Sequence, residues 1–236
     1  SSKRIVSAPV GLHQTVEVIC TLIEKRLAEA KRAPKLTEKH CRDELVACML
    51  SSQVRFETSN LAFERLQTNG LLSNARWRAS DDGFERDLSA ALADSNTCAD
   101  QRSAYRFPQM RSRQIATLRE CLRGEPLLSR IEHQKDVKHI RARLVENLPG
   151  IGPKQASMLL RNLGVSYDVA ILDTHVLEFF RSIGVLPRTN VSVSTIKHYE
   201  TTEAIASRFA EGIGYRVGLL DWAIWITMRA ARELRL

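Results

Sequence analysis

The stretch Leu148–Val176, LPGIGPKQASMLLRNLGVSYDVAILDTHV, determines how the rest of the chain is interpreted. Gly150 and Gly152 permit backbone angles that a residue with a Cβ resists, so we expect a tight turn there. The preceding segment, Val137–Asn147, is predicted to be a helix. The pattern therefore predicts a helix, a glycine hairpin and a second helix.

A proline opens this second helix, where its missing N–H group costs nothing. The helix is predicted over Lys154–Leu163, and Gly164 is expected to end it as a left-handed cap. The N–H groups at the start of a helix have no partner within the helix and attract an anion such as a phosphate. We therefore expect Gly150, Gly152 and Lys154 to bind a phosphate group.

Two residues of the stretch are candidates for chemistry. Lys154 lies in the first helical turn, where the helix dipole disfavours a cation and favours the neutral, nucleophilic amine. Asp173 follows the apolar strip Val169–Leu172 and precedes a helix predicted over Thr174–Ser182. Each alone has an ordinary alternative, a solvated lysine and a helix N-cap. Their combination with an anion-binding hairpin favours a catalytic pair.

The pattern LPGIGPK, followed after a helix by LDTHV, resembles the helix-hairpin-helix GPD superfamily of DNA base-excision glycosylases. The resemblance places Lys154 at the catalytic lysine of the bifunctional members and Asp173 at the aspartate of the superfamily. LSSQ, Leu50–Gln53, resembles the segment that enters the duplex, which implies that Gln53 fills the hole left by a flipped base. AYRFPQMRSRQI, Ala104–Ile115, resembles the archaeal-type second class of 8-oxoguanine DNA glycosylase/lyase.

The sequence pattern predicts an all-α protein, since the one strand signal, Val169–Leu172, is four residues long. The resemblance implies two helical lobes that flank a DNA-binding cleft. One lobe is expected over 36–165, with the helix-hairpin-helix motif at about 137–164. The other combines 1–35 with 166–236. Lys154 and Asp173 would face each other across the cleft.

A final helix is predicted over Tyr215–Leu234. Asp221, Trp225 and Met228 share one face of this helix because they lie four and three positions apart. An aromatic residue on such a face is usually part of the core. The resemblance implies instead that this face and the Arg-Phe-Pro segment line the pocket for the extruded base, formed by Phe107, Asp221, Trp225 and Met228.

Charge supports a nucleic-acid partner. The chain of 236 residues has a formal net charge of +8 and a sequence pI of about 9.5, which predicts affinity for a polyanion. Its most basic stretch, Arg102–Arg123, is rich in arginine, which binds phosphate well. A solvated basic face is the alternative for about half of these arginines. We expect the partner to be double-stranded DNA that contains a damaged base, bound by a monomer.

Five cysteines are scattered, at positions 20, 41, 48, 98 and 121, and lack the close spacing of metal ligands. We expect buried thiols, no metal and no cofactor. The iron–sulfur cluster of some relatives needs four closely spaced cysteines near the C-terminus, which this chain lacks. No targeting or membrane segment is recognised, so the expected location is cytoplasmic and nucleoid-associated in a prokaryote, or nuclear in a eukaryote.

The predicted function is a bifunctional DNA glycosylase/AP lyase that removes an oxidised base, 8-oxoguanine by resemblance, through a lysine Schiff base and β-elimination. Members of that class typically end on a lysine, whereas this chain ends Glu233-Leu234-Arg235-Leu236, so another damaged or modified base stays open. A lyase for oxidised pyrimidines and a monofunctional glycosylase that uses only Asp173 are alternatives. A non-catalytic helix-hairpin-helix module is the alternative from a different class.

Overall fold

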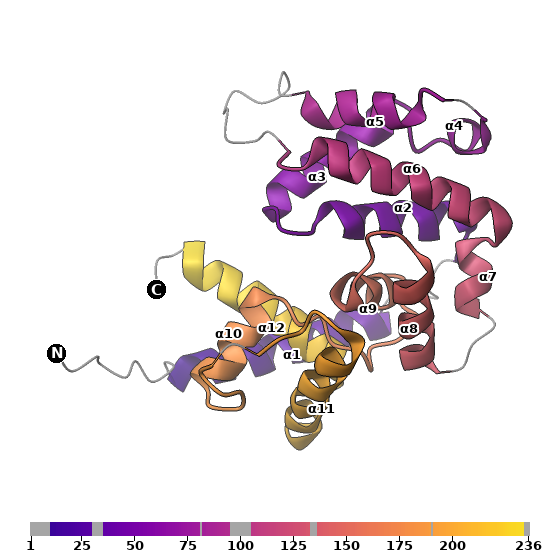
Figure 1. Ribbon diagram of the computed structural model, residues 1–236. Helices are drawn as coiled ribbons and strands as arrows, with labels where there is room; N and C mark the ends of the chain where they lie inside the picture. Colours follow the sequence, from indigo (N-terminus) through magenta and orange to yellow (C-terminus); the bar gives the residue numbers. More distant parts are fainter. Residues whose placement is uncertain are drawn as a thin grey trace. The chain divides into compact units, whose positions relative to one another are not determined.

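The computed structural model describes residues 10–29, 35–80, 82–94, 105–132, 136–189 and 191–233, and no strand occurs in these ranges. The all-α prediction is therefore confirmed (Figure 1). The helices are α1 (Val10–Glu29), α2 (Glu38–Leu50), α3 (Phe56–Thr68), α4 (Asn74–Arg78), α5 (Phe84–Ala93), α6 (Pro108–Gly124), α7 (Leu127–Glu132), α8 (Val137–Asn147), α9 (Pro153–Asn162), α10 (Thr174–Ser182), α11 (Ile196–Gly212) and α12 (Val217–Glu233).

The turn between α8 and α9 has one residue whose backbone requires glycine. Gly150 has a φ of 70°, in the left-handed region that glycine adopts without steric cost. Gly152 has φ −101° and ψ 175°, so the expectation that both glycines need unusual angles was wrong for Gly152. Its extended backbone leads directly into Pro153 at the first position of α9. The Gly152 N–H donates to Oε1 of Gln155 at 3.2 Å.

The end of α9 is a left-handed glycine cap, as predicted. Gly164 has a φ of 70°. Its N–H donates to the carbonyl of Arg161, and the next N–H, of Val165, donates to the carbonyl of Leu160, both at 2.9 Å. These two bonds form a Schellman motif, which satisfies carbonyls that the helix itself leaves unpaired.

Two compact units make up the chain. Lys35–Ile151 is one unit, and Ser1–Pro34 joins Gly152–Leu236 in the other. The predicted division into 36–165 and 1–35 with 166–236 stays a prediction. The boundary between the two compact units lies before α9. A hydrogen-bonded ion pair between Arg161 on α9 and Asp221 on α12 ties this helix to the C-terminal part.

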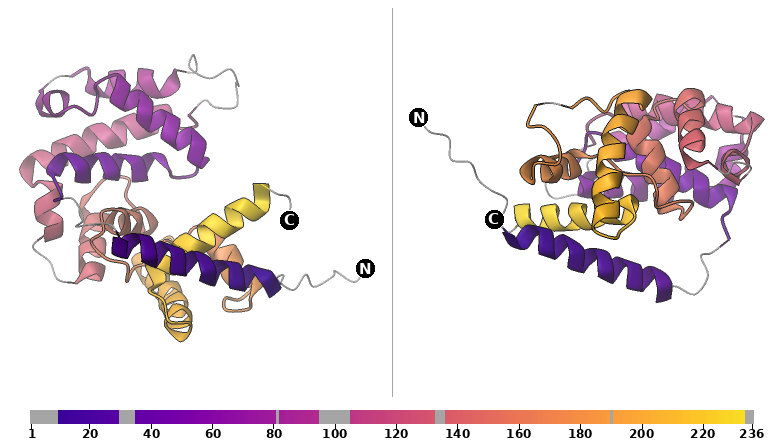
Figure 2. Two further views of the ribbon diagram at one scale, coloured as in Figure 1. Left: turned by 180° about the vertical axis from the view of Figure 1, so that it is seen from behind. Right: turned by 90° about the horizontal axis from the view of Figure 1, so that it is seen from below.

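In the unit that contains both chain ends, α12 is the central helix. It packs against α1, α10 and α11, and Figure 2 shows α1 lying along α12. Val16 and Ile23 of α1 are buried, and Ile19 and Leu27 are partly buried against the same core. These four residues therefore form one apolar face of α1, directed into the core of this unit.

In the unit Lys35–Ile151, α2 packs against α3, α6 and α7, and α5 packs against α3 and α6. Leu45, Val46, Met49 and Leu50 on α2 have no exposed surface, as their apolar spacing predicts.

Cysteine placement agrees with the prediction of buried thiols. Cys20, Cys41 and Cys48 are buried and Cys121 is partly buried, while Cys98 lies outside the described residues. Burial raises the pKa of Cys20 to about 12 and that of Cys41 to about 11. Across the part of the chain that the structure describes, no helix has both the length and the apolar character needed to cross a membrane.

Candidate active site

Lys154 occupies the first turn of α9, as predicted, and its side chain is partly buried. Leu148, Ile151 and Pro153 around the turn are buried, whereas Gly150 at its tip is exposed. The apolar residues therefore anchor the hairpin and leave the tip accessible. A cation at a helix N-terminus meets the positive end of the helix dipole, which favours the uncharged amine.

Asp173 is the N-cap of α10. Its Oδ1 accepts a hydrogen bond from the N–H of Val176 at 2.9 Å, so the ordinary capping role is present. Among the described residues, Oδ2 has no hydrogen-bond partner. The carboxylate is thus oriented through one oxygen, and its second oxygen remains available for another interaction.

The strip before Asp173, Val169–Leu172, is buried and belongs to no helix or strand. The backbone groups of this strip form hydrogen bonds with side chains instead of with a neighbouring strand. Glu203 accepts from the N–H of Ala170 at 2.8 Å. The Tyr199 hydroxyl accepts from the N–H of Leu172 at 3.0 Å and donates to the carbonyl of Ala170 at 2.7 Å. Buried backbone groups need such partners, so these bonds fix the path that leads into Asp173.

The start of α12 also holds this segment. The N–H of Gly218 donates to the carbonyl of Tyr167 at 2.8 Å. A Cβ added to Gly218 would lie 2.8 Å from that carbonyl oxygen and 2.9 Å from the carbonyl oxygen of Val169. Only glycine therefore allows α12 to approach the backbone this closely.

Asp221 is buried, with 2% of its surface exposed. Its Oδ1 pairs with Nη1 of Arg161, and its Oδ2 accepts from the N–H of Ile171, both at 2.5 Å. Burial raises the pKa of Asp221 to about 7, although Arg161 and the Ile171 N–H act in the opposite direction. The carboxylate therefore joins α9, which carries Lys154, to the strip that precedes Asp173.

The predicted base-pocket residues lie in different parts of the chain. Trp225 and Met228 on α12 are partly buried, and the guanidinium carbon of Arg229 lies 5.2 Å from the Trp225 ring centroid. Phe107 precedes α6, in the unit Lys35–Ile151, and the guanidinium carbon of Arg106 lies 4.9 Å from its ring centroid. The base-pocket assignment of these residues and of Asp221 stays a prediction.

Gln53 lies in the turn between α2 and α3, is exposed, and has a φ of 60°. Such a backbone angle is uncommon outside glycine and often marks a functional turn.

The predicted site residues are divided between the two compact units. One unit contains Gly152, Lys154, Asp173, Asp221, Trp225 and Met228, and the other contains Gln53, Phe107 and Gly150.

The arginine-rich stretch divides by burial. Arg106, Arg113 and Arg123 are exposed, while Arg111 and Arg119 are buried at 4% and 5% exposure, and Arg102 lies outside the described residues. The expectation of phosphate contacts is therefore wrong for the two buried side chains. Both lie on the apolar face of α6 at helical spacing from Ile115, a signal that the sequence contained.

The sequence did not identify three residues that position the site. Arg161, Tyr199 and Glu203 hold Asp221 or the strip before Asp173. Two of them, Tyr199 and Glu203, lie on α11, Ile196–Gly212. Tyr199 and Glu203 lie four positions apart on its buried face, together with Ala206 and Ala210. That periodicity was the available signal.

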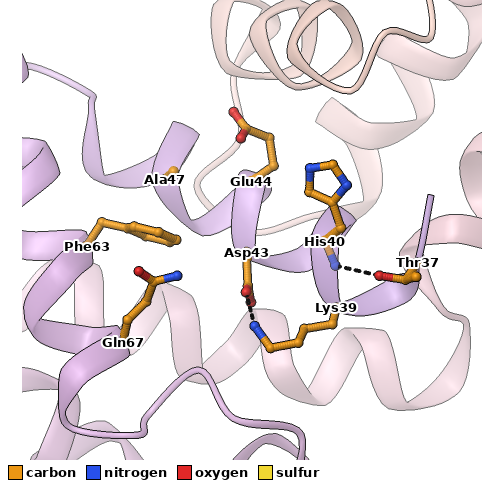
Figure 3. A pocket seen from close by; sticks show the side chains of 8 residues that line it. All are labelled: Thr37, Lys39, His40, Asp43, Glu44, Ala47, Phe63 and Gln67. Carbon is orange, nitrogen blue, oxygen red and sulfur yellow. Dashed lines mark hydrogen bonds and ion pairs between the residues drawn. The ribbon is translucent and has the colours of Figure 1, made fainter. Parts of the chain in front are cut away.

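A hollow of about 370 Å³ lies between α2 and α3, and none of the predicted site residues lines it. Figure 3 shows its lining side chains. In it Lys39 forms an ion pair with Asp43, and the N–H of His40 donates to Oγ1 of Thr37 at 3.2 Å. The hollow is lined by Thr37, Lys39, His40, Asp43, Glu44, Ala47, Phe63 and Gln67. None of these residues was predicted to act in the reaction.

Comparison with known proteins identifies the family of this chain. A family described as 8-oxoguanine DNA glycosylase matches residues 23–215. The 8-oxoguanine DNA glycosylase/AP lyase of Sulfurisphaera tokodaii is 30% identical over 77% of this chain and 78% of its own. That of Saccharolobus solfataricus is 37% identical over 123 residues, which cover 51% of this chain and 58% of the relative. The chain therefore matches less than two thirds of the latter protein.

Solved structures show the same fold. The crystal structure of the 8-oxoguanine DNA glycosylase of Thermotoga maritima has a TM-score of 0.68 at 28% identity, over 91% of this chain and 92% of that one. The enzyme of Methanocaldococcus jannaschii, crystallised with a 15mer DNA that contains 8-oxoguanine, has a TM-score of 0.73 at 23% identity, over 94% and 98%. By its matched length and its similarity to these relatives, this chain belongs to the 8-oxoguanine DNA glycosylase family.

Proposed function

We propose that this protein is a DNA glycosylase with AP lyase activity that removes 8-oxoguanine from double-stranded DNA. The observation that carries the proposal is a lysine at the start of the hairpin helix, Lys154, in the same compact unit as the half-buried carboxylate of Asp173. Family membership and the 30% identical relative named 8-oxoguanine DNA glycosylase/AP lyase support it.

The reaction requires the damaged base to leave the duplex. An enzyme cannot reach the base in the stack, so it extrudes the nucleotide at a cost of a few kcal/mol. In the proposal, the exposed Gln53 side chain fills the space that the base vacates, and the hairpin around Gly150 grips a phosphate. Because the Gly152 N–H donates to Gln155, that amide can bind phosphate only after the Gln155 side chain moves.

The chemistry then proceeds at the sugar. The neutral amine of Lys154 attacks C1′, the glycosidic bond breaks, and the base leaves with the bonding electrons and is protonated. Asp173 stabilises the positive charge that develops on the sugar. The amine bonded to C1′ loses a proton, and the bond between C1′ and O4′ then breaks as O4′ takes up a proton, which opens the sugar ring and leaves a protonated imine between Lys154 and C1′. Loss of a C2′ proton then breaks the bond between C3′ and its phosphate oxygen, and water hydrolyses the imine to release the lysine.

A second candidate is the same chemistry on another oxidised or modified base. It is favoured by Asp221, which was predicted to line the base pocket but has both carboxylate oxygens bonded to Arg161 and Ile171. If the Asp221 carboxylate forms no hydrogen bond with the extruded base, any preference for 8-oxoguanine depends on the other predicted pocket residues, Phe107, Trp225 and Met228.

The test is borohydride trapping on a panel of duplexes that carry single lesions. Borohydride reduces the imine, so a covalent protein–DNA adduct identifies a lysine Schiff base. We expect an adduct with the 8-oxoguanine duplex for the wild type and none for Lys154→Gln. Equal adducts for both proteins would refute the lysine assignment. An adduct on a different lesion alone would transfer the proposal to that base, and binding without any adduct would favour a non-catalytic DNA-binding module.

The proposed partner is double-stranded DNA, bound by a monomer. The exposed arginines Arg106, Arg113 and Arg123 are suited to the phosphate backbone, which supplies most of the salt-dependent affinity. The protein is proposed to act where the DNA of its cell lies, at the nucleoid or in the nucleus.

A further inference from the structure

The turn that carries Gln53 needs support from the rest of the unit Lys35–Ile151. Its φ of 60° places a non-glycine residue in the left-handed region, a strained conformation that persists only where the surroundings enforce it. The turn follows the last residue of α2, where helix carbonyls lack partners within the helix. Groups that bond these carbonyls therefore hold the turn.

Two buried side chains from the region of α6 provide such bonds. The hydroxyl of Tyr105 donates to the carbonyl of Leu50 at 3.0 Å. Nη2 of Arg111 lies 3.5 Å from the carbonyl oxygen of Ser52, directly before Gln53. Tyr105 and Arg111 are each 4% exposed. They reach the turn from inside the fold and are shielded from solvent.

The second terminal nitrogen of the Arg111 guanidinium bonds Gln114, which lies against the hairpin. Nη1 of Arg111 donates to Oε1 of Gln114 at 2.6 Å. The side-chain amide of Gln114 lies against one side of the exposed Gly150, and a Cβ added to this glycine would be 2.5 Å from Cδ of Gln114. A side chain at position 150 would therefore displace the Gln114 amide, and the φ of 70° independently favours glycine there. Ser52, Arg111, Gln114 and Gly150 all belong to one compact unit.

Packing alone does not explain a buried arginine here. Among the described residues, Arg111 has no carboxylate within ion-pair distance, and its Nε has no hydrogen-bond partner. A buried cation that contacts only neutral oxygens costs free energy compared with an apolar side chain of similar size. What the guanidinium adds is a planar fork that bonds two acceptors at once.

We propose that Arg111 and Gln114 are positioning residues that brace the Gln53 turn against the hairpin turn at Gly150. The brace fixes the spacing between the element that enters the duplex and the element that binds phosphate. This role rests on the proposed function for its consequence in catalysis, but the brace itself is a property of the free protein. Neither side chain needs to touch DNA.

The first experiment uses the free protein and hydrogen exchange. In Arg111→Met, the amides of the Gln53 turn and of the hairpin should exchange at least tenfold faster, while the core of α2 stays protected. Arg111→Lys should behave like Arg111→Met, because an ammonium lacks the fork. Gln114→Met, which keeps the length of the side chain but removes the acceptor, should loosen the hairpin. Arg86→Met is the matched control, since its side chain is 81% exposed and bonds Asp87 within α5 rather than either turn.

The second experiment adds duplexes with 2-aminopurine beside the lesion, whose fluorescence reports base extrusion. Arg111→Met should lower extrusion and single-turnover excision at least tenfold and leave affinity for undamaged duplex within twofold of the wild type. Restoration by Arg111→Lys would show a charge contact to DNA and overturn the brace. Unchanged exchange at both turns in Arg111→Met and Gln114→Met would also overturn it. Faster exchange in these variants, combined with no excision by the wild type, would support the brace and refute only the proposed function.

Discussion

Gly218→Ala is the change that most directly tests how the Asp173 segment is held. Gly218 lies in the first turn of α12 and donates its N–H to the carbonyl of Tyr167. The added methyl group would meet backbone rather than flexible side chains, at 2.8 Å and 3.0 Å from the oxygen and Cα of Tyr167 and 2.9 Å from the oxygen of Val169. Backbone atoms cannot turn away, so either α12 or the segment must move.

The magnitude follows from three contributions. Reaching an ordinary contact of 3.4 Å from 2.8 Å needs a shift of 3.4 − 2.8 = 0.6 Å. Overpacking of this kind costs about 1–3 kcal/mol. A weakened hydrogen bond to Tyr167 adds about 0.5–1.5 kcal/mol. The higher helix propensity of alanine returns at most about 1 kcal/mol. We expect a net destabilisation of about 2 kcal/mol and a fall in Tm of about 4–8 °C for a chain of this size.

The assay measures Tm and single-turnover excision on the same preparations. Because the displaced segment leads into Asp173, excision should fall more than tenfold at a temperature where the variant is fully folded. Gly212→Ala is the control, since a Cβ there meets nothing within 4 Å, and its Tm should stay the same or rise. An unchanged Tm and unchanged excision in Gly218→Ala would refute the close approach as a constraint on the site.

Four further predictions concern the same unit and its partner. Asp173→Asn keeps the shape of the cap and should fold and bind lesion DNA, but single-turnover excision should fall ten- to a thousand-fold, about 1.4–4 kcal/mol; unchanged excision would leave Asp173 as a cap only. Tyr199→Phe leaves the N–H of Leu172 and the carbonyl of Ala170 without the hydroxyl, and chemical denaturation should show a loss of about 1–3 kcal/mol for each unsatisfied group. Burial raises the pKa of Asp221 to about 7, so the folded protein binds this proton more tightly than the unfolded chain. The free energy of unfolding, measured relative to Asp221→Asn, should therefore fall between about pH 4 and pH 7 and level off above pH 7. Parallel stability curves for the two proteins would contradict this prediction. Affinity for undamaged duplex should fall steeply with salt concentration, and a flat titration would exclude phosphate-dominated binding.

The local parts of the site were predictable from the sequence. The hairpin, its second helix and the Gly164 cap depend on glycine and proline within a few positions of one another, and α8 and α10 have their predicted bounds. Asp173 was identified as a possible N-cap because a capping residue and its helix are adjacent in the chain. Signals of this kind are complete within about a dozen residues, so no tertiary information is needed to interpret them.

The contacts that position Asp173 were not predictable in the same way. The bonds from Ala170 to Glu203 and from Ile171 to Asp221 join residues 33 and 50 positions apart. Nothing within either segment specifies its partner. Arg111 is an intermediate case, because its helical spacing from Ile115 indicates a buried position, whereas composition alone suggested a phosphate ligand. An apolar stripe that includes a charged residue was the more informative signal.

The two interpretations of Asp173 are compatible because its carboxylate has two oxygens. Oδ1 accepts from the Val176 N–H and thereby fixes the direction of the group, which leaves Oδ2 to act on the sugar in the proposed reaction. The backbone before it is held by Tyr199, Glu203 and Asp221, so the carboxylate does not need to reorganise as charge develops. The cap is then part of the preorganisation, and Asp173→Asn separates the two roles because it preserves the cap and removes the charge.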